Sequence, residues 1–526
     1  MSSRPSSAWA PLRTQIFRTV WIASVVSNIG TWMHEVGAAW LMTTLAPSAF
    51  MVGMIQTMES VPIFALALLA GALADVIDRR RILLATQVWM VIVAGALGVL
   101  TLLGGTTPVM LLIFTFALSI GSALAGPAWQ ASMPDLVGRD ELPAAVALNG
   151  VAFNIARAIG PALGGLVVAA VGSGGVFLIN ALSFIGVVWA IAQWKRAPVR
   201  SVMPAERLAG AVRAGLRYVR HSRPMRSVLW RSGGFIFSGS VVWTVLPLLA
   251  RSEYHLSSVG YGILLGCFGA GAIAAATIMQ RVHKRLGTDA LMMLGTLLFC
   301  LTIVVLALVR FMPAVYLAMF VCGGVWMILM SNFTIVAQYV VPAWVRARAL
   351  AVYQMVFWIG FAGGSVLWSA VATKVGVPAT MLWAAASAVV GLAATFQHRL
   401  GVQDSLDLTP SQHWDAPVVK REPEPDAGPV MITVEYRVAH EHEAEFLDAL
   451  RDLSVIRRRD GAVQWGIFHD TADPARFVET WVVESWAEHM RQHERVTVTD
   501  RAAEERVQAF HLGENPPVVE HFVYAR

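Results

Sequence analysis

GALADVIDRRR (residues 71–81) joins a long apolar run to three consecutive arginines. The apolar run is long enough to cross a bilayer as a helix, in which every backbone group is satisfied internally. Arginine clusters are typical of the cytoplasmic side of such helices. The segment therefore predicts a membrane helix that ends at the cytoplasmic surface.

Twelve apolar runs of this kind follow one another along the chain. Their approximate limits are 16–43, 50–74, 82–103, 108–128, 143–171, 174–194, 227–250, 257–280, 288–310, 313–338, 350–373 and 378–397. The N-terminal segment and the loops after even-numbered runs collect 22 Lys and Arg, whereas the opposite side carries three. This asymmetry predicts that both termini face the cytoplasm. The fold class expected is an all-α membrane protein with twelve transmembrane helices.

The composition separates this body from a soluble tail. Charged residues make up only 14% of the 526 residues, against about 25% in a soluble domain. Residues 1–400 carry 27 Lys and Arg against 10 Asp and Glu, whereas residues 401–526 carry 13 against 24. The net charge of +6 does not indicate nucleic-acid binding, because the basic residues are scattered along loops between apolar runs. The lipid bilayer is the partner that the composition predicts.

The body divides into two similar halves. Met133–Val137 is echoed by Val341–Val345, and each is followed by a glycine pair inside the next run. Six helices plus six, separated by a basic loop, is the arrangement of transporters with two pseudo-symmetric halves and a site between them. We expect an N-terminal half at 1–200, a cytoplasmic amphipathic linker helix at 201–226 and a C-terminal half at 227–400.

The linker helix has an apolar face and a basic face. The apolar face carries Leu208, Val212, Leu216 and Val219, and the basic face carries Arg213, Arg217 and Arg220. Two interpretations are open. The helix lies on an anionic lipid surface, or it binds a partner.

A polar linker at 401–429 leads to a domain at 430–526. Its patterns of alternation and helical spacing predict the order β-α-β-β-α-β, which suggests a ferredoxin-like α+β domain. Domains of this kind often pair through their sheets, so a dimer is a further expectation by analogy. His489 and His493 are spaced i, i+4, but a solvated helix face explains them better than a metal site. We expect no metal and no cofactor.

Three ionisable residues deep in the apolar runs are candidates for proton coupling. Ionisable groups inside a membrane are costly and are usually functional. At about 1.5 Å per residue, Glu35, Glu59 and Arg157 lie roughly 21–25 Å from the cytoplasmic ends of their helices. We expect a polar cluster with Asn28 and Asn154, in which Arg157 pairs with one glutamate and one glutamate exchanges a proton. The alternatives are a static ion pair, or a Glu35 hydrated from outside.

Other polar and aromatic residues inside the runs could line a substrate cavity between the halves. Asparagine and glutamine can hydrogen-bond a substrate, and tryptophan can cover its apolar parts, although most membrane tryptophans serve packing. The candidates are Trp32, Gln56, Asn332, Gln354 and Trp358.

The segment at 71–81 resembles the loop motif between the second and third helices of the major facilitator superfamily. The resemblance implies that Asp75 acts as a conformational latch, with Gly71, Arg79 and Arg80 in the same motif. Val76 and Asp78 depart from the usual pattern, in which a basic residue and a glycine stand at these positions.

A second motif lies in the fifth run, at residues 156–165. Gly160, Pro161, Gly164 and Gly165 are similar to the Gly-Pro motif of the antiporter branches of that superfamily. Proline kinks a helix, and glycines allow helices to approach closely. With the segment at 126–137, the body looks most like the enterobactin- and macrolide-exporter branch, the transmembrane secretion effectors. The resemblance implies proton-driven export of a small drug-like or siderophore-like compound across the bacterial inner membrane, although an arginine common in the fourth helix of related antiporters is missing.

Two other classes of function remain open. The body could be a membrane-embedded sensor that signals through its tail, or an exporter fused to an enzyme, because the shape of the tail resembles small monooxygenase-like domains. A sensor binds its ligand without moving it, so a measurement of flux separates the first alternative from a transporter. ATP drive is disfavoured, because the sequence contains no phosphate-binding G-x-x-x-x-G-K-[ST] loop.

Overall fold

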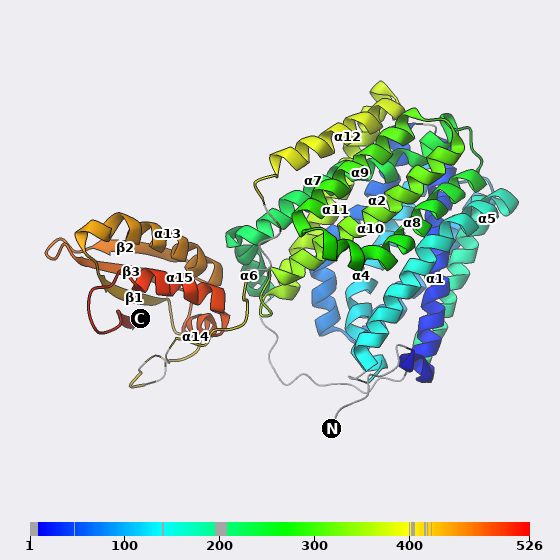
Figure 1. Cartoon of the computed structure of the whole chain (residues 1–526). Helices are drawn as coiled ribbons and strands as arrows, with labels where there is room; N and C mark the ends of the chain where they lie inside the picture. Colours follow the sequence, from blue (N-terminus) through cyan, green and yellow to red (C-terminus); the bar gives the residue numbers. More distant parts are fainter. Residues whose placement is uncertain are drawn as a thin grey trace. The chain divides into compact units, whose positions relative to one another are not determined.

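The computed structural model has a bundle of long helices and a small α+β domain (Figure 1). It describes residues 9–46, 48–138, 141–194, 208–398, 400, 406–414, 417, 419–421 and 423–525, without the side chains of residues 68, 72, 74–76, 143, 208–212, 280 and 284. After a short 3-10 turn at Ala10–Arg13, the helices of the body are α1 (Gln15–Leu45), α2 (Ala49–Val76), α3 (Arg79–Leu102), α4 (Pro108–Leu136), α5 (Leu142–Gln193), α6 (Leu208–His221), α7 (Arg223–Ser252), α8 (Ser258–Arg285), α9 (Thr288–Leu308), α10 (Met312–Tyr339), α11 (Arg346–Val375) and α12 (Val377–Ala394).

Ten helices of the described chain are long and apolar enough to cross a membrane. Two differences separate this number from the twelve predicted runs. Helix α1 is 31 residues long but is not one of the ten, and α5 contains both the fifth and the sixth run. Within α5 the backbone leaves helical geometry at Gly172, where φ is 76°, a value that glycine adopts without steric cost. The membrane-spanning, mostly helical architecture agrees with the prediction, and the count of twelve stays a prediction.

Glycines of α5 allow two other helices to pack closely against it. A Cβ atom on Gly164 would lie 2.9 Å from the Cα atom of Met33 in α1. On the other side, a Cβ on Gly262 of α8 would lie 2.8 Å from the Pro161 oxygen, and one on Gly165 would collide with the Ser258 oxygen. Helix α5 therefore packs between α1 of its own half and α8 of the other half.

The chain forms two compact units. The first comprises Met1–Met203, Trp230–Phe333 and Gln354–Gln397, and the second comprises Pro204–Leu229, Thr334–Tyr353 and His398–Arg526. The second unit therefore contains the tail together with α6 and the adjoining ends of α7, α10 and α11. The predicted domain boundaries at residues 200, 226, 400 and 429 stay predictions.

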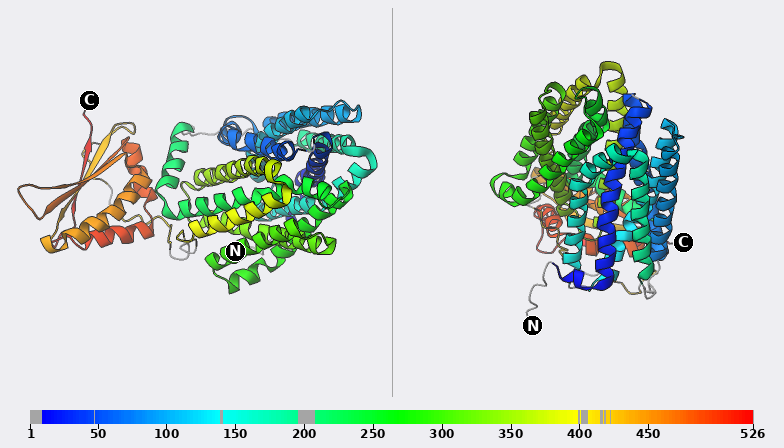
Figure 2. Two further views of the ribbon diagram at one scale, coloured as in Figure 1. Left: turned by 90° about the horizontal axis from the view of Figure 1, so that it is seen from above. Right: turned by 90° about the vertical axis from the view of Figure 1, so that its right-hand side faces the viewer.

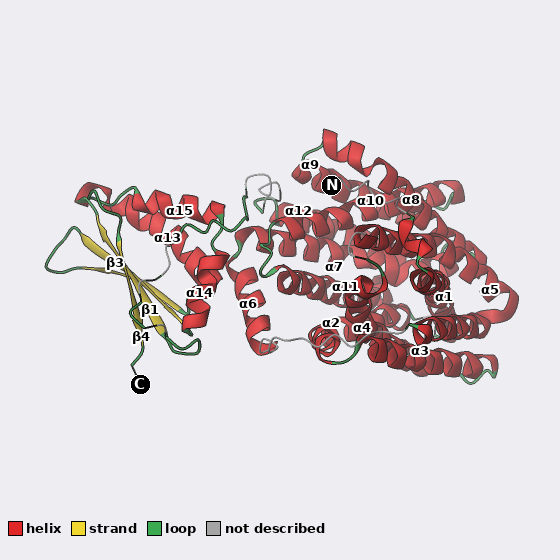
Figure 3. Ribbon diagram, turned by 90° about the horizontal axis from the view of Figure 1, so that it is seen from below, coloured by secondary structure: helices red, strands yellow, loops and turns green. Residues whose placement is uncertain are grey.

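The tail contains a four-stranded antiparallel sheet with the order β2-β3-β1-β4. Its helices cover one face of the sheet (Figures 2 and 3). Ile432 and Trp481 of the sheet are buried against Phe446 and Leu450. The elements are β1 (Val430–Arg437), a 3-10 turn at His440–His442, α13 (Glu443–Asp460), β2 (Gln464–His469), β3 (Arg476–Val483), α14 (Trp486–Arg495), α15 (Val498–Gln508) and β4 (Val518–Val523).

The second helix of the predicted β-α-β-β-α-β order is two helices, α14 and α15, so that part of the prediction is wrong. The Thr497 hydroxyl accepts a hydrogen bond from the main-chain N–H of Asp500, and the Asp500 carboxylate accepts one from the N–H of Thr497. This reciprocal cap starts a new helix and ends the previous one. The order is otherwise as predicted, and the ferredoxin-like assignment stays a prediction.

The glycine contacts of α5 predict opposite effects for two alanine substitutions. Gly165→Ala should lower the thermal unfolding temperature of the purified protein in detergent, because overpacking costs about 1–3 kcal/mol. Gly150→Ala is in the same helix, and no atom of the described residues lies within 4 Å of its Cβ position. This substitution should leave the unfolding temperature unchanged or raise it, because alanine favours helix. Equal effects of the two substitutions would contradict the close packing at Gly165.

Candidate functional site

Two carboxyl groups meet inside the first unit. Glu35 of α1 and Glu59 of α2 are close enough for their carboxyl groups to interact electrostatically. Helix α4 packs at the same level, because the Ser119 hydroxyl donates to the main-chain oxygen of Glu59. The two carboxyl groups and the Ser119 hydroxyl therefore lie at one level of the helix bundle, where α1, α2 and α4 meet.

Arg157 of α5 lies among aromatic rings next to this pair. Its guanidinium carbon is 5.8 Å from the ring centre of Trp32, 6.0 Å from that of Trp243 and 5.2 Å from that of Phe268. Trp32 is in α1, whereas Trp243 and Phe268 are in α7 and α8 of the other half. We call Arg157 and these three rings the arginine cage.

The predicted pairing of Arg157 with a glutamate is not a direct ion pair. The charge of Arg157 acts on Glu35, but in the described part of the chain no carboxylate oxygen lies within 4 Å of the guanidinium. The Arg157 Nε atom is buried and has no hydrogen-bond partner. Residue spacing indicates which side chains share a face of one helix, but it does not indicate contacts between the two halves. Two of the three rings around Arg157 come from the second half.

The other predicted members of the polar cluster make local contacts. The side-chain amide of Asn154 donates to the main-chain oxygen of Gly150, 2.9 Å away in the same helix. Asn28 and Gln56 are half-buried. Their part in proton coupling stays a prediction.

The predicted cavity residues divide between the arginine cage and other neighbours. Trp32 belongs to the cage, where its ring centre is 6.4 Å from that of Trp243. Asn332 is buried and its side-chain oxygen is 2.5 Å from Nε2 of His283. Trp358 packs against neighbouring phenylalanines of its own helix, and Gln354 is exposed. Of the predicted cavity residues, only Trp32 contacts the arginine cage within the described part of the chain.

The arginines of the 71–81 loop hold the ends of neighbouring helices. Arg79 donates to the main-chain oxygen of Ala131, 2.7 Å away, and its guanidinium lies 3.4 Å from the Asp135 carboxylate. Arg80 donates to the main-chain oxygen of Ala192, 2.8 Å away. Within the described part of the chain, a Cβ on Gly71 would meet no atom within 4 Å. The Asp75 side chain lies outside the described residues, so its role as a latch stays a prediction.

The inner face of the tail contains a closed polar cluster. The Arg457 guanidinium is 4.3 Å from the ring centre of Trp481 and forms ion pairs with Glu479 and Glu504 at 3.3 and 2.5 Å. Although burial opposes it, the Arg457 charge, with hydrogen bonds from His413 and Trp414, lowers the pKa of Glu504 to about 2. These groups satisfy one another, which is typical of a structural network.

Within the second unit, the tail contacts α6. Arg217 of α6 forms an ion pair with Glu488 of α14 at 2.9 Å. Arg495 of α14 also binds Glu488, and its guanidinium lies 4.4 Å from the ring centre of Trp344 in the α10–α11 loop. Of the two interpretations of the linker helix, these contacts favour the partner, and that partner is the tail. Leu216 of its predicted apolar face is exposed, whereas the side chains of Leu208 and Val212 lie outside the described residues.

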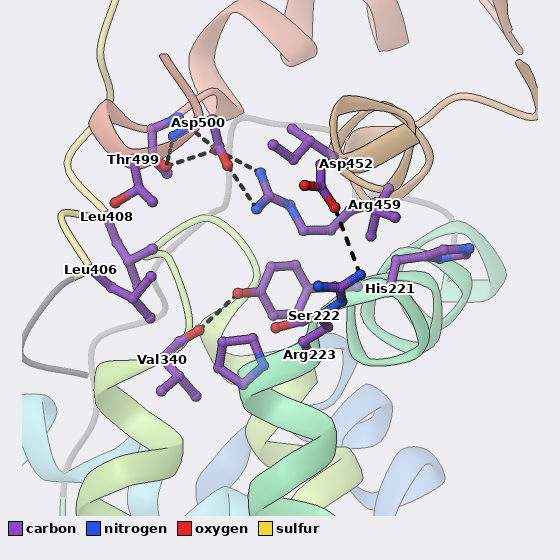
Figure 4. A pocket seen from close by; sticks show the side chains of 15 residues that line it. His221, Ser222, Arg223, Val340, Leu406, Leu408, Asp452, Arg459, Thr499 and Asp500 are labelled. Carbon is purple, nitrogen blue, oxygen red and sulfur yellow. Dashed lines mark hydrogen bonds and ion pairs between the residues drawn. The ribbon is translucent and has the colours of Figure 1, made fainter. Parts of the chain in front are cut away.

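A cavity of about 180 Å³ lies at this contact, and its charged groups point toward one another (Figure 4). Arg459 binds the Asp500 carboxylate at 2.6 Å, and Arg223 lies 3.7 Å from Asp452. The buried Tyr218 hydroxyl donates to the main-chain oxygen of Val340 at 2.8 Å. Because these groups are paired, the cavity is best explained as part of the joint between the tail, α6 and the start of α7.

The profile of the family described as transmembrane secretion effector matches residues 6–526. The chain belongs to this family. It is therefore a multi-pass membrane transporter of the major facilitator superfamily, and the predicted branch is confirmed. The fold and the relatives indicate a transporter and not an enzyme.

Curated relatives of this transporter are similar to it over half of its length or more. The chain is 27% identical to the staphyloferrin A transporter of Staphylococcus aureus, over 53% of this chain and 70% of that protein. It is 24% identical to the multidrug efflux pump Tap of Mycolicibacterium fortuitum, over 68% and 89%. It is 28% identical to the enterobactin exporter EntS of Salmonella choleraesuis, over 51% and 64%.

The fold is also similar to solved transporters. The inward-facing, unoccupied structure of a bacterial homologue of the human lysosomal transporter Spinster aligns with a TM-score of 0.60. The alignment covers 77% of this chain and 99% of that chain at 13% identity. At this identity the likeness shows the fold alone.

The histidines of α14 predict an acid-sensitive tail. Burial, followed by the charges of His521 and His493, lowers the pKa of His489 from 6.5 to about 3. Below pH 6.5 the His489 side chain takes up a proton in the unfolded chain but not in the folded tail. The contribution of this group to the stability of the tail is therefore fully present above pH 6.5 and is lost as the pH falls toward 3. At pH 5.5 this single group should cost about 1.4 kcal/mol.

Thermal unfolding of the fragment 406–526 at pH 7.5 and 5.5 measures this effect. His489→Phe keeps a buried ring but cannot be protonated, so its unfolding temperature should fall less than that of the unchanged fragment. His440, which is exposed, provides the control substitution His440→Phe. An equal fall for all three proteins would contradict the assignment to His489.

Proposed function

We propose that this chain is a secondary active transporter that couples proton entry to the export of a small amphipathic compound, drug-like or siderophore-like, across the bacterial inner membrane. The observation that carries the proposal is the pair of neighbouring carboxyl groups of Glu35 and Glu59 next to the arginine cage. A carboxyl pair that holds one proton can gain or lose it as its surroundings change. The names of the exporter and efflux-pump relatives support export as the direction.

The position of the arginine cage supports alternating access. Trp32 and Arg157 belong to one half, whereas Trp243 and Phe268 belong to the other. A rocking motion of the halves changes the distances across the cage, which exposes it to one side of the membrane at a time. In this mechanism the Asp75 loop stabilises one of the two states, with both termini in the cytoplasm.

The tail contacts support a regulatory or structural role for the C-terminal domain. Its inner polar groups are paired with one another, and its outer groups bind α6. A membrane-embedded sensor would use the same contacts, but it would bind its ligand without moving it. Flux through the purified protein therefore separates a transporter from a sensor.

Proton coupling predicts a selective loss in two variants. The substrate is first identified as the compound that accumulates inside a deletion strain and outside its parent. In proteoliposomes, Glu35→Gln and Glu59→Gln should abolish the accumulation of this compound that a pH gradient drives, because neither amide can exchange a proton. Both variants should still exchange the compound across the membrane without a gradient.

Glu253→Gln is the matched control. Glu253 forms an ion pair with Arg310 at 2.9 Å, away from the arginine cage, so its loss should leave driven accumulation intact. Unchanged driven accumulation in both Glu35→Gln and Glu59→Gln would overturn the coupling role of the pair.

We also propose that two copies pair through the uncovered face of the tail sheet. Met431, Phe468 and Phe522 lie on this face and are 39%, 61% and 46% exposed. Phe522→Glu should convert a dimer into a monomer in light scattering of the full-length protein in detergent. Leu512→Glu changes an exposed apolar residue outside the sheet and should leave the dimer intact. A monomeric unchanged protein would contradict this proposal.

A further inference from the structure

Arg157 is a cation inside the bundle without a direct counter-charge. Within the described residues no carboxylate oxygen lies within 4 Å of its guanidinium, and its buried Nε atom makes no hydrogen bond. The charge of the nearby Glu35 acts on Arg157 without a direct contact. Contact with aromatic rings offsets only a small part of the free energy that transfer of an unpaired charge from water into an apolar interior costs. The free protein therefore holds a group that gains stability when an anion binds.

The surroundings of Arg157 also indicate the kind of anion. A guanidinium binds a carboxylate through two parallel hydrogen bonds, and the rings of the arginine cage offer faces and edges to a second aromatic system. Arg157, Trp32 and Trp243 are half-buried, whereas Phe268 is buried. Protein atoms therefore leave part of the cation and of two of the rings uncovered.

The geometry points to the arginine cage as the site that binds the substrate, and it assigns the substrate to the aromatic carboxylates and related aromatic anions. The Arg157 guanidinium binds the negative group, and Trp32 and Trp243 cover the aromatic part from the two halves. This inference rests on the proposed transport function and names the chemical class of its substrate. It gives Arg157 a role in substrate binding in place of a structural ion pair.

An anionic lipid headgroup has the same charge and is the other possible source of a ligand. The rings favour the aromatic anion, because a phosphate ester has no flat apolar surface to place against Trp32 and Trp243. The experiment therefore includes a lipid arm.

Equilibrium binding of radiolabelled salicylate to the purified full-length protein in detergent tests the assignment. Salicylate is an aromatic carboxylate, and salicylamide has nearly the same shape without the charge. The unchanged protein should bind salicylate at least about tenfold more tightly than salicylamide, because hydrogen bonds to a charged group are stronger than neutral ones. Equal affinities would overturn the assignment.

Substitutions of Arg157 locate the binding. Arg157→Gln should weaken salicylate binding about tenfold or more and leave salicylamide binding unchanged. Arg157→Lys keeps the charge without the planar guanidinium, so its salicylate affinity should lie between that of the unchanged protein and that of Arg157→Gln. This variant decides the outcome if the glutamine variant fails to fold. An unchanged salicylate affinity in the folded variants would overturn the proposal.

Arg251→Gln is the matched control. Arg251 also lies over a tryptophan ring, 5.9 Å from the centre of Trp40, but it donates a hydrogen bond to Thr43 at 3.0 Å. Its loss should leave salicylate binding unchanged. An equal loss in the two glutamine variants would show a general charge effect and would overturn the assignment to Arg157.

The lipid arm uses short-chain phosphatidylglycerol as a competitor. Stronger competition by this lipid than by unlabelled salicylate would assign the site to a headgroup and would overturn the substrate class. Failure of this inference remains distinct from failure of the transport function. If the protein transports the compound identified in the deletion strain but does not prefer salicylate to salicylamide, only the substrate class is wrong. If it transports no compound at all, the proposed transport function itself is wrong.

Discussion

A charged group inside a bilayer must be paired, hydrogen-bonded or hydrated, and this requirement governs how the transport helices face one another. Glu35 and Glu59 place their carboxyl groups next to each other, and Arg157 turns to aromatic rings. These contacts connect α1, α2, α5, α7 and α8. Rotation of any one of these helices about its axis would carry a charge or a ring out of the cluster. The positions of a few polar atoms therefore restrict the packing of apolar helices that hydrophobicity alone would leave free to rotate.

The same place in the bundle joins packing to chemistry. Gly269 follows Phe268 in α8, and a Cβ on Gly269 would lie 2.6 Å from the Cα atom of Ala158 and 3.0 Å from the Arg157 oxygen. The glycine contact between α5 and α8 is thus one residue away from the cation and from one of its rings. A sliding motion of α8 along α5 must change the distance between Phe268 and Arg157. Movement of the halves therefore changes the surroundings of the Arg157 charge directly, because the residues at the helix contact are bonded to Arg157 and to Phe268.

The sequence predicted what depends on local patterns. The lengths of the apolar runs predicted most helix limits to within a few residues. Because few ionisable residues lie inside these runs, Glu35, Glu59 and Arg157 could be identified as candidates for the site. It did not predict that Trp243 and Phe268 surround Arg157, because contacts between the two halves leave no pattern in one chain. The division of the second tail helix was readable, since Thr497-x-x-Asp500 is a capping signature. The partner of Arg79, Asp135, was also hidden, because it lies 56 residues away across a helix packing contact.

The repeated segments of the two halves differ in the residues that hold them. In the first half, the segment at 133–137 contains Asp135, which binds Arg79 of the preceding basic loop. In the matching segment at 341–345, alanine stands in place of that aspartate, so no carboxylate is available at this position. The neighbouring Trp344 instead offers a ring face, and the cation over it is Arg495 of the tail. Glu488 binds both Arg495 and Arg217 of α6. An arginine thus contacts the corresponding segment in each half, and in the second half this arginine comes from the tail. Because the Glu488 carboxylate binds both Arg495 and Arg217, it connects the tail to the linker helix α6 and to the α10–α11 loop.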